Sequence, residues 1–154
     1  MEIFNDSPPS VLHAEFPGHF ENLSDIAAFV RKAAVEAGLD DFSVYSVETA
    51  VDEACSNIIE HAYKGKQNGI ITITCTIIPG ELTVELHDTG KSFDPTRVPK
   101  PKLDVPLEER QDSGLGLYFI NQLMDEVVFS FDQKSGNTLT MKKKASPLQP
   151  PNKQ

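Results

Sequence analysis

The chain has 154 residues, a length typical of one domain that buries a proper hydrophobic core. Hydrophobic residues make up 39% of the chain and charged residues 24%, which disfavours a disordered or fibrous protein. The formal net charge of −9 disfavours binding to nucleic acid or to an anionic membrane surface, and no apolar run approaches the roughly 18 residues of a membrane span.

The amino-terminal sequence and the cysteines both indicate a cytoplasmic protein. No basic segment followed by an apolar stretch opens the chain, so we do not expect a secretory signal. The two cysteines, Cys55 and Cys75, lack CxxC spacing and are too few for a secreted disulfide framework. We expect both to be reduced thiols in the core.

The first part of the chain predicts a strand followed by a helix. Residues 11–16 read as a short strand that ends in a turn. The helix is capped by Asn22 or Ser24, and its apolar residues recur at intervals of three and four until Gly38, which suits a carboxyl-terminal cap.

A second helix is predicted from Ser43 to Gly65. Apolar residues at helical spacing form one stripe along it, as in a helix with one buried face. The stripe consists of Val44, Val47, Val51, Ala54, Cys55, Ile58 and Ala62.

The hydrophobic period changes to two between residues 69 and 88. Two alternating runs flank Pro79 and Gly80, a pattern that predicts an antiparallel hairpin. Residues 91–112 are rich in proline and charge without a sustained period, and a loop of that length inside a domain indicates a lid or a disordered segment.

The last part of the chain predicts a helix from about residue 114 and a hairpin that turns near Ser135 and Gly136. The order of elements predicts an α/β two-layer sandwich, with helices on one face of a mixed, mostly antiparallel sheet. The domain spans residues 11–144, and we expect residues 1–10 and 145–154 to be flexible tails.

Three polar residues lie along one side of the second predicted helix. With Glu53 taken as zero, Asn57 falls at about 40° and His61 at about 80°, next to an apolar stripe at roughly 100° to 200°. Polar groups at this rim can meet a ligand held between helix and sheet. The alternative is an ordinary solvated helix face, on which such spacing is common.

Two further clusters follow the sheet and the long loop. Asp88 ends a predicted strand and is followed by Gly90, which suits a ligand amino group that needs an acceptor, although a plain turn also explains them. Gly114 and Gly116 open the next helix, where exposed N–H groups can bind phosphate, unless they form only a hinge. The pattern is neither the dinucleotide fingerprint nor a Walker loop.

In this order the three clusters resemble the nucleotide-binding boxes of the GHKL ATPase superfamily. The nearest branch is that of the bacterial anti-sigma-factor serine-protein kinases, with "ExxxNxxxHAY", "DxGxxFDP" and "GLGL" boxes. The matching residues are Glu53, Asn57, His61-Ala62-Tyr63, Asp88, Gly90, Phe93-Asp94-Pro95 and Gly114-Leu115-Gly116-Leu117. The resemblance implies the GHKL, or Bergerat, fold and ATP with Mg²⁺ as cofactors.

The resemblance also implies a role for each matching residue. Glu53 would be the general base, and Asn57 would hold Mg²⁺. Asp88 would accept from the adenine amino group, and Gly90 would let the base approach. The remaining nucleotide-binding residues would be Phe93, Gly114, Leu115, Gly116 and Thr138, with residues 92–113 as the ATP lid. His61 matches the motif, but a role in packing or in a hydrogen bond at the helix end explains it as well as contact with a ligand does.

The implied function is an ATP- and Mg²⁺-dependent serine-protein kinase that phosphorylates an anti-anti-sigma partner of the STAS type and that also binds a sigma factor. The same resemblance suggests a homodimer. One alternative is a binding module of this fold, in which ATP orders the lid without phosphoryl transfer. The other is a metal hydrolase that uses Asp52, Glu53, His61 and His87, but Asp52 points about 100° away from Glu53.

Overall fold

The computed structural model of the chain describes residues 8–64, 68–91 and 112–146, with side chains in the last segment described from Leu117 onward. The predicted loop, except for Lys91 and Asp112, and most of the predicted tails lie outside these residues. No helix in the three described segments has the length and hydrophobicity that crossing a lipid bilayer requires.

Five strands form one sheet in the order β1-β2-β3-β5-β4. All four neighbouring pairs are antiparallel, so the described strands confirm the predicted sandwich with a sheet in which every pair is antiparallel. β3 and β4 run in the same direction because β5 lies between them, and the chain crosses from β3 to β4 by way of α3. The strands are β1 (Ser10–Pro17), β2 (Ile70–Ile78), β3 (Glu81–Asp88), β4 (Glu126–Asp132) and β5 (Gly136–Lys144).

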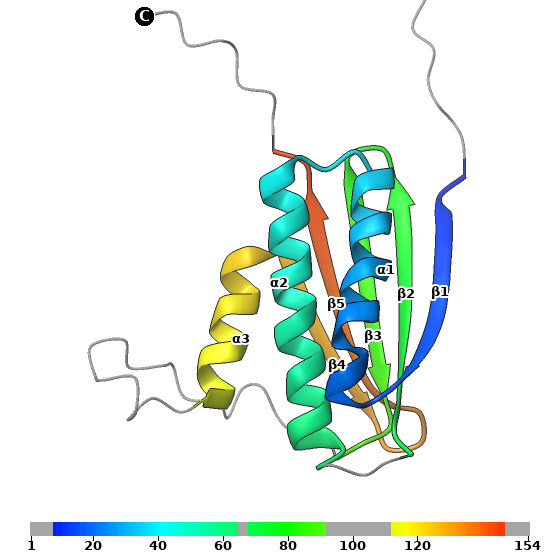
Figure 1. The fold of residues 1–154 in the computed structure, drawn as a ribbon, viewed down its shortest axis with the longest axis vertical. Coiled ribbons are helices and arrows are strands. Elements are labelled where there is room, and N and C mark those ends of the chain that lie inside the picture. The colour runs from blue at the N-terminus through cyan, green and yellow to red at the C-terminus, as the bar shows by residue number, and fades with distance from the viewer. Residues whose placement is uncertain (1–7, 65–67, 92–111, 147–154) are drawn as a thin grey trace, which may run out of the picture.

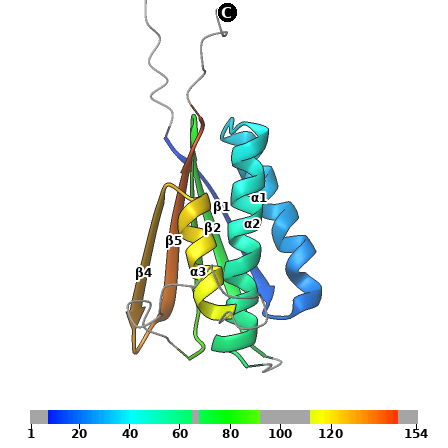
Figure 2. The ribbon, with the colours of Figure 1, turned by 90° about the vertical axis from the view of Figure 1, so that its left-hand side faces the viewer.

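The described helices lie on one face of this sheet, as predicted, and none of them covers the other face (Figures 1 and 2). α1 and α2 run side by side across the sheet, and α3 lies next to α2 over the β5 and β4 side (Figure 1). The helical elements are a 3₁₀ turn (Phe20–Asn22), α1 (Leu23–Glu36), α2 (Asp41–Asn57), a π-helical turn (Ile58–Ala62) and α3 (Asp112–Leu123).

α2 begins at Asp41, two residues before the predicted start at Ser43, because Asp40 caps the helix. The Asp40 carboxylate accepts from the Ser43 hydroxyl at 2.6 Å and from the Ser43 N–H at 3.3 Å. It also accepts from the N–H of Ser146, which follows β5. The Ser43 and Ser146 hydrogen bonds lower the pKa of Asp40 to about 2.

The core fills the space between the helices and the sheet. Side chains of α1 and α2 meet the inward residues of β2, β3 and β5, which alternate as a half-buried sheet requires. Cys55 and Cys75 are free and fully buried in this core, which confirms their predicted state. The largest fully buried side chains are Ile26, Ile71, Ile73, Leu82, Leu86, Ile120 and Met141.

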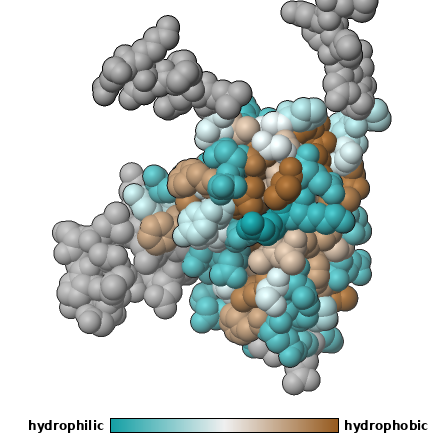
Figure 3. All heavy atoms as spheres, turned by 45° about the horizontal axis from the view of Figure 1, so that its top comes forward, coloured by the Kyte–Doolittle hydropathy of each residue, from teal (hydrophilic) through white to brown (hydrophobic). Residues whose placement is uncertain are grey.

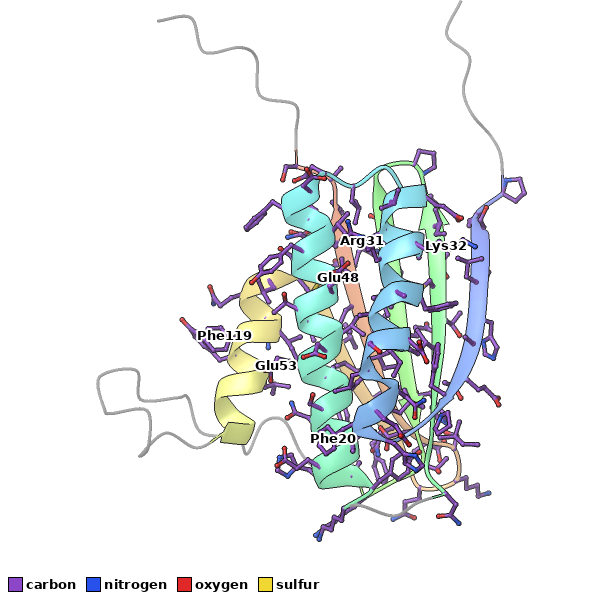
Figure 4. The ribbon with its side chains drawn as sticks, viewed as in Figure 1. Phe20, Arg31, Lys32, Glu48, Glu53 and Phe119 are labelled. Carbon is purple, nitrogen blue, oxygen red and sulfur yellow. The ribbon has the colours of Figure 1, made fainter. Side chains whose placement is uncertain are left out.

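The surface at the junction of α1 and α2 is mixed in character. Val35 and Phe42 are more than half exposed there. In Figure 3, which brings this end of the molecule forward, hydrophobic patches are broken up by hydrophilic ones. Between the two helices Arg31 forms an ion pair with Glu48 at 2.9 Å, so that Glu48 faces α1 (Figure 4).

Candidate functional site

A cavity lies where α2, α3 and the sheet meet. Its volume is about 30 Å³, which is room for a water molecule and far less than the roughly 300 Å³ of a small ligand pocket. A ligand as wide as a purine therefore requires the walls to part. The lining residues are Ala54, Asn57, Ile58, Ala62, Asp88, Lys91, Leu117, Ile120, Phe129, Asn137 and Leu139.

The polar floor of this cavity is a buried pair, Asp88 and Asn137. Asp88 ends β3 and Asn137 is its direct partner on β5, and each is only 4% exposed. Oδ1 of Asp88 accepts from Nδ2 of Asn137 and from the N–H of Gly90, both at 2.9 Å. Nδ2 of Asn137 also donates to the carbonyl of Gly90 at 3.1 Å.

Burial raises the pKa of Asp88, and the hydrogen bonds from Asn137 and Gly90 oppose the shift. The two donors occupy Oδ1, whereas Oδ2 receives no hydrogen bond from a described residue. The carboxylate is thus held in a fixed orientation with one oxygen available to a ligand donor.

Gly90 is required by a protein contact that the sequence does not show. A Cβ atom at this position would lie 2.6 Å from the carbonyl carbon and oxygen of Ala62, at the end of the π-helical turn. The N–H of Lys91 donates to that same carbonyl oxygen at 2.8 Å. In this structure the close approach at Gly90 is therefore to Ala62, and the predicted approach to a bound base remains a prediction.

Tyr63 joins the end of the second helix to the strand that carries Asp88. Its ring is buried, and its hydroxyl accepts from the N–H of Thr89 at 3.0 Å and donates to the carbonyl of Ile70. A Cβ atom at Gly69 would lie 2.6 Å from the ring, and one at Gly18 would lie 3.0 Å from it. The ring thus fits between two glycines while its hydroxyl fixes the residue after Asp88.

The structure separates the polar trio of the second helix. Asn57 lines the cavity at the last residue of α2. Glu53 lies one turn earlier, is partly buried, and is not among the lining residues; in Figure 4 its label lies beside α2 on the side of α3. His61 is exposed, with Nε2 3.9 Å from Oε2 of Glu60. The helix changes to π geometry directly after Asn57, a feature that often marks functional sites.

Thr138 and Asn137 point to opposite faces of β5, because successive residues of a strand alternate. Thr138 Oγ1 lies 3.0 Å from Nδ1 of its β3 neighbour His87, and only Asn137 reaches the cavity. The structure does not bring Thr138 to the predicted site. Sequence reasoning missed Asn137, although it shares the face of the apolar residues Leu139 and Met141.

The glycine box lies in the first turns of α3. Gly114, Leu115 and Gly116 follow the start of that helix at Asp112, which is two residues earlier than predicted. Leu117 and Ile120 of this helix line the cavity. Phe93 and residues 92–111 of the predicted lid lie outside the described residues.

The four residues considered for a metal hydrolase do not gather. His87 contacts Thr138 on the open face of the sheet, while His61 lies at the surface beside Glu60. The described residues contain no group of three or more His, Cys, Asp or Glu side chains placed to hold a metal ion.

Comparisons with known proteins agree with this arrangement. The model of the histidine kinase-like ATPase domain matches residues 16–143. An anti-sigma F factor of Clostridium botulinum is 35% identical over 77% of this chain and 80% of its own length. A serine-protein kinase RsbW of Bacillus cereus is 32% identical over 86% of this chain and 83% of its own length.

A similar fold occurs in the solved structure of the RsbU and RsbW domains of Rv1364c from Mycobacterium tuberculosis. The TM-score is 0.63 at 18% identity, and the match covers 90% of this chain but only 33% of that larger chain. The chain therefore belongs to the histidine kinase-like ATPase family of the GHKL superfamily, in the branch that contains anti-sigma factors and serine-protein kinases.

Proposed function

We propose that this protein is an ATP- and Mg²⁺-dependent serine-protein kinase that acts as an anti-sigma regulator. The observation that supports it most is the buried Asp88 and Asn137 pair on the floor of a mostly apolar cavity. A buried carboxylate with one unused oxygen suits a ligand that presents an amino group. The names of the relatives point to the same class of activity.

The cavity fits the base of ATP in chemistry. Ala54 of α2 and Ile58 of the π-helical turn form one apolar wall, and Leu117 and Ile120 of α3 form another, so a flat ring would lie between them once the walls part. Asp88 Oδ2 would accept from the exocyclic amino group of adenine. The narrowness of the cavity implies that α3 moves away from α2 when the base enters.

Asn57 is the residue that would hold Mg²⁺. Its amide oxygen is a hard ligand, and Mg²⁺ keeps several waters and takes phosphate oxygens, so one protein ligand is sufficient. When bound, the ion would neutralise negative charge on the phosphates of ATP. Gly114, Leu115 and Gly116 in the first turns of α3 would contribute backbone N–H groups to the phosphates.

Glu53 would act as the general base. It lies four residues before Asn57 on α2, one helical turn from the metal ligand. As the serine oxygen of the partner bonds to the γ-phosphorus, the bond from that phosphorus to the β–γ bridging oxygen breaks and ADP leaves. Glu53 takes the proton of the serine hydroxyl.

The proposed protein substrate is an anti-anti-sigma protein of the STAS type, and a sigma factor is the second partner. We also propose a cytoplasmic homodimer, as the resemblance implies. The predicted contribution of Phe93 and of the lid to ATP binding belongs to this proposal.

The test is phosphate transfer from labelled ATP to a STAS protein by the wild type, Glu53→Gln and Glu48→Gln. Glu48 is the matched control because it lies on the same helix and pairs with Arg31 away from the cavity. We expect Glu53→Gln to lose transfer by about 10²-fold or more while ATP affinity stays the same, and Glu48→Gln to retain transfer. ATP-dependent partner binding by a wild type that transfers no phosphate would instead identify a binding module.

A further inference from the structure

Asn137 carries a buried acceptor that the fold itself does not use. Its side-chain Oδ1 has no solvent exposure to speak of and no hydrogen-bond partner among the described residues. A buried oxygen without a hydrogen-bond partner is unfavourable, and in a native protein such an atom calls for a partner such as a ligand, a water or an ion. Asn137 lines the cavity of the proposed ATP site, so this oxygen requires an explanation there.

The orientation of the Asn137 amide follows from its neighbours. Two acceptors, Oδ1 of Asp88 and the carbonyl of Gly90, lie 2.9 and 3.1 Å from Nδ2. Only the amide nitrogen can donate to both, and exchange of the two amide atoms would place three oxygens against one another. Both Nδ2 hydrogens are thereby used, and Oδ1 is left as an acceptor.

With both Nδ2 hydrogens used, this pair leaves two acceptor oxygens and no side-chain donor for a ligand that parts the walls of the cavity. Asp88 contributes Oδ2, and Asn137, bound to the same carboxylate, contributes Oδ1. An exocyclic amino group of the adenine type carries two hydrogens on one nitrogen, in the plane of the ring. A 6-oxo purine would instead place a carbonyl oxygen against these acceptors.

We propose that Asn137 is a specificity-determining residue that accepts the second hydrogen of the purine 6-amino group, while Asp88 accepts the first. This inference rests on the proposed function, since it deepens ATP binding at the same site. It also implies that Asn137 does not donate to N1 of the base, because both Nδ2 hydrogens are bound to Asp88 and Gly90.

Calorimetric titration of the full chain with ATP, N6-methyl-ATP and 1-deaza-ATP tests the proposal. Whichever way the methyl group points, one of the two acceptors loses its hydrogen, so wild type should bind N6-methyl-ATP about tenfold more weakly than ATP. 1-Deaza-ATP, which lacks N1, should bind within about threefold of ATP.

The variant Asn137→Ala separates this role from a general loss of structure. With only Asp88 left to accept, the methyl group can occupy the space of the missing amide, and the ratio of the two affinities should fall to about twofold or less. Thr138→Ala is the control, because Thr138 lies on the opposite face of β5. It should keep the wild-type ratio.

Equal binding of ATP and N6-methyl-ATP by wild type would overturn the proposal, as would a tenfold loss with 1-deaza-ATP, which would mean that the amide donates to N1. An unchanged ratio in Asn137→Ala would also overturn it. No binding of ATP by folded wild type would refute the proposed function itself, and with it this inference.

Discussion

Removal of one hydroxyl group, in Tyr63→Phe, should weaken both the fold and the proposed nucleotide site. Phenylalanine keeps the ring that packs between Gly18 and Gly69. What is lost is the acceptor for the N–H of Thr89 and the donor to the carbonyl of Ile70. The variant therefore isolates two hydrogen bonds at almost unchanged packing.

The size of the effect follows from the exposure of the two backbone groups. A typical hydrogen bond contributes about 1 kcal/mol, and a buried group left without a partner costs about 1 to 3 kcal/mol. Ile70 and Thr89 belong to exposed residues, so water replaces part of what is lost. We expect a decrease in the free energy of unfolding of about 1 to 3 kcal/mol, or roughly 3 to 10 °C in Tm for a chain of this length.

ATP affinity should fall as well, because Thr89 lies between Asp88 and the Gly90 N–H that holds its carboxylate. Thermal and urea unfolding measure the first effect, and calorimetric titration measures the second. Tyr45→Phe is the matched control, since Tyr45 is 60% exposed and should change the free energy of unfolding by less than about 0.5 kcal/mol. If Tyr63→Phe behaves like this control in both assays, the hydroxyl does not hold the site.

Two further predictions concern other contacts of the fold. Gly90→Ala places a Cβ atom 2.6 Å from the Ala62 backbone, so it should lower the free energy of unfolding by about 2 kcal/mol or more and also weaken ATP binding. Gly38→Ala, at φ +80° in open space, is the control: it should lower the free energy of unfolding by about 1 to 2 kcal/mol and leave ATP affinity unchanged in the same titration. The contribution of Asp40 to stability should depend on pH, because its folded pKa of about 2 lies below the unfolded value. The difference in Tm between wild type and Asp40→Asn should therefore have its full size above about pH 5 and should shrink as the pH falls toward about 2. A pH-independent difference would contradict the assigned carboxylate cap.

The sequence predicts the sheet hairpins well because their signals are local. Alternation on both sides of Pro79 and Gly80 is sufficient for β2 and β3, and Gly80 has the positive φ of 79° that such a turn favours. Helix ends are harder to predict. The cap of α2 depends on Asp40 side-chain geometry, and the π-helical turn after Asn57 has no signature in residue type.

The site is predictable only in part, because its chemistry depends on pairing across strands. Asn57 and Asp88 stand out as polar residues at the ends of apolar elements, and both line the cavity. Asn137 becomes significant only through its register opposite Asp88, which a single sequence does not specify. The family motif predicts that Thr138 contacts the ligand, whereas the alternation of side chains along β5 places its neighbour Asn137 in the cavity.

The same few contacts hold the carboxylate and close the fold at this end of the sheet. Tyr63 ties the π-helical turn to Thr89, the Gly90 backbone rests on Ala62, and Asn137 bridges Asp88 to Gly90. A ligand that donates to Asp88 and Asn137 would therefore stabilise the whole junction, since binding to the folded state alone adds RT ln(1 + [L]/Kd) to stability. At an ATP concentration of about 100 times the Kd of the variant, this term is about 2.7 kcal/mol, which is comparable to the expected cost of losing the Tyr63 hydroxyl. Saturating ATP should therefore bring the Tm of Tyr63→Phe most of the way back to that of ligand-free wild type.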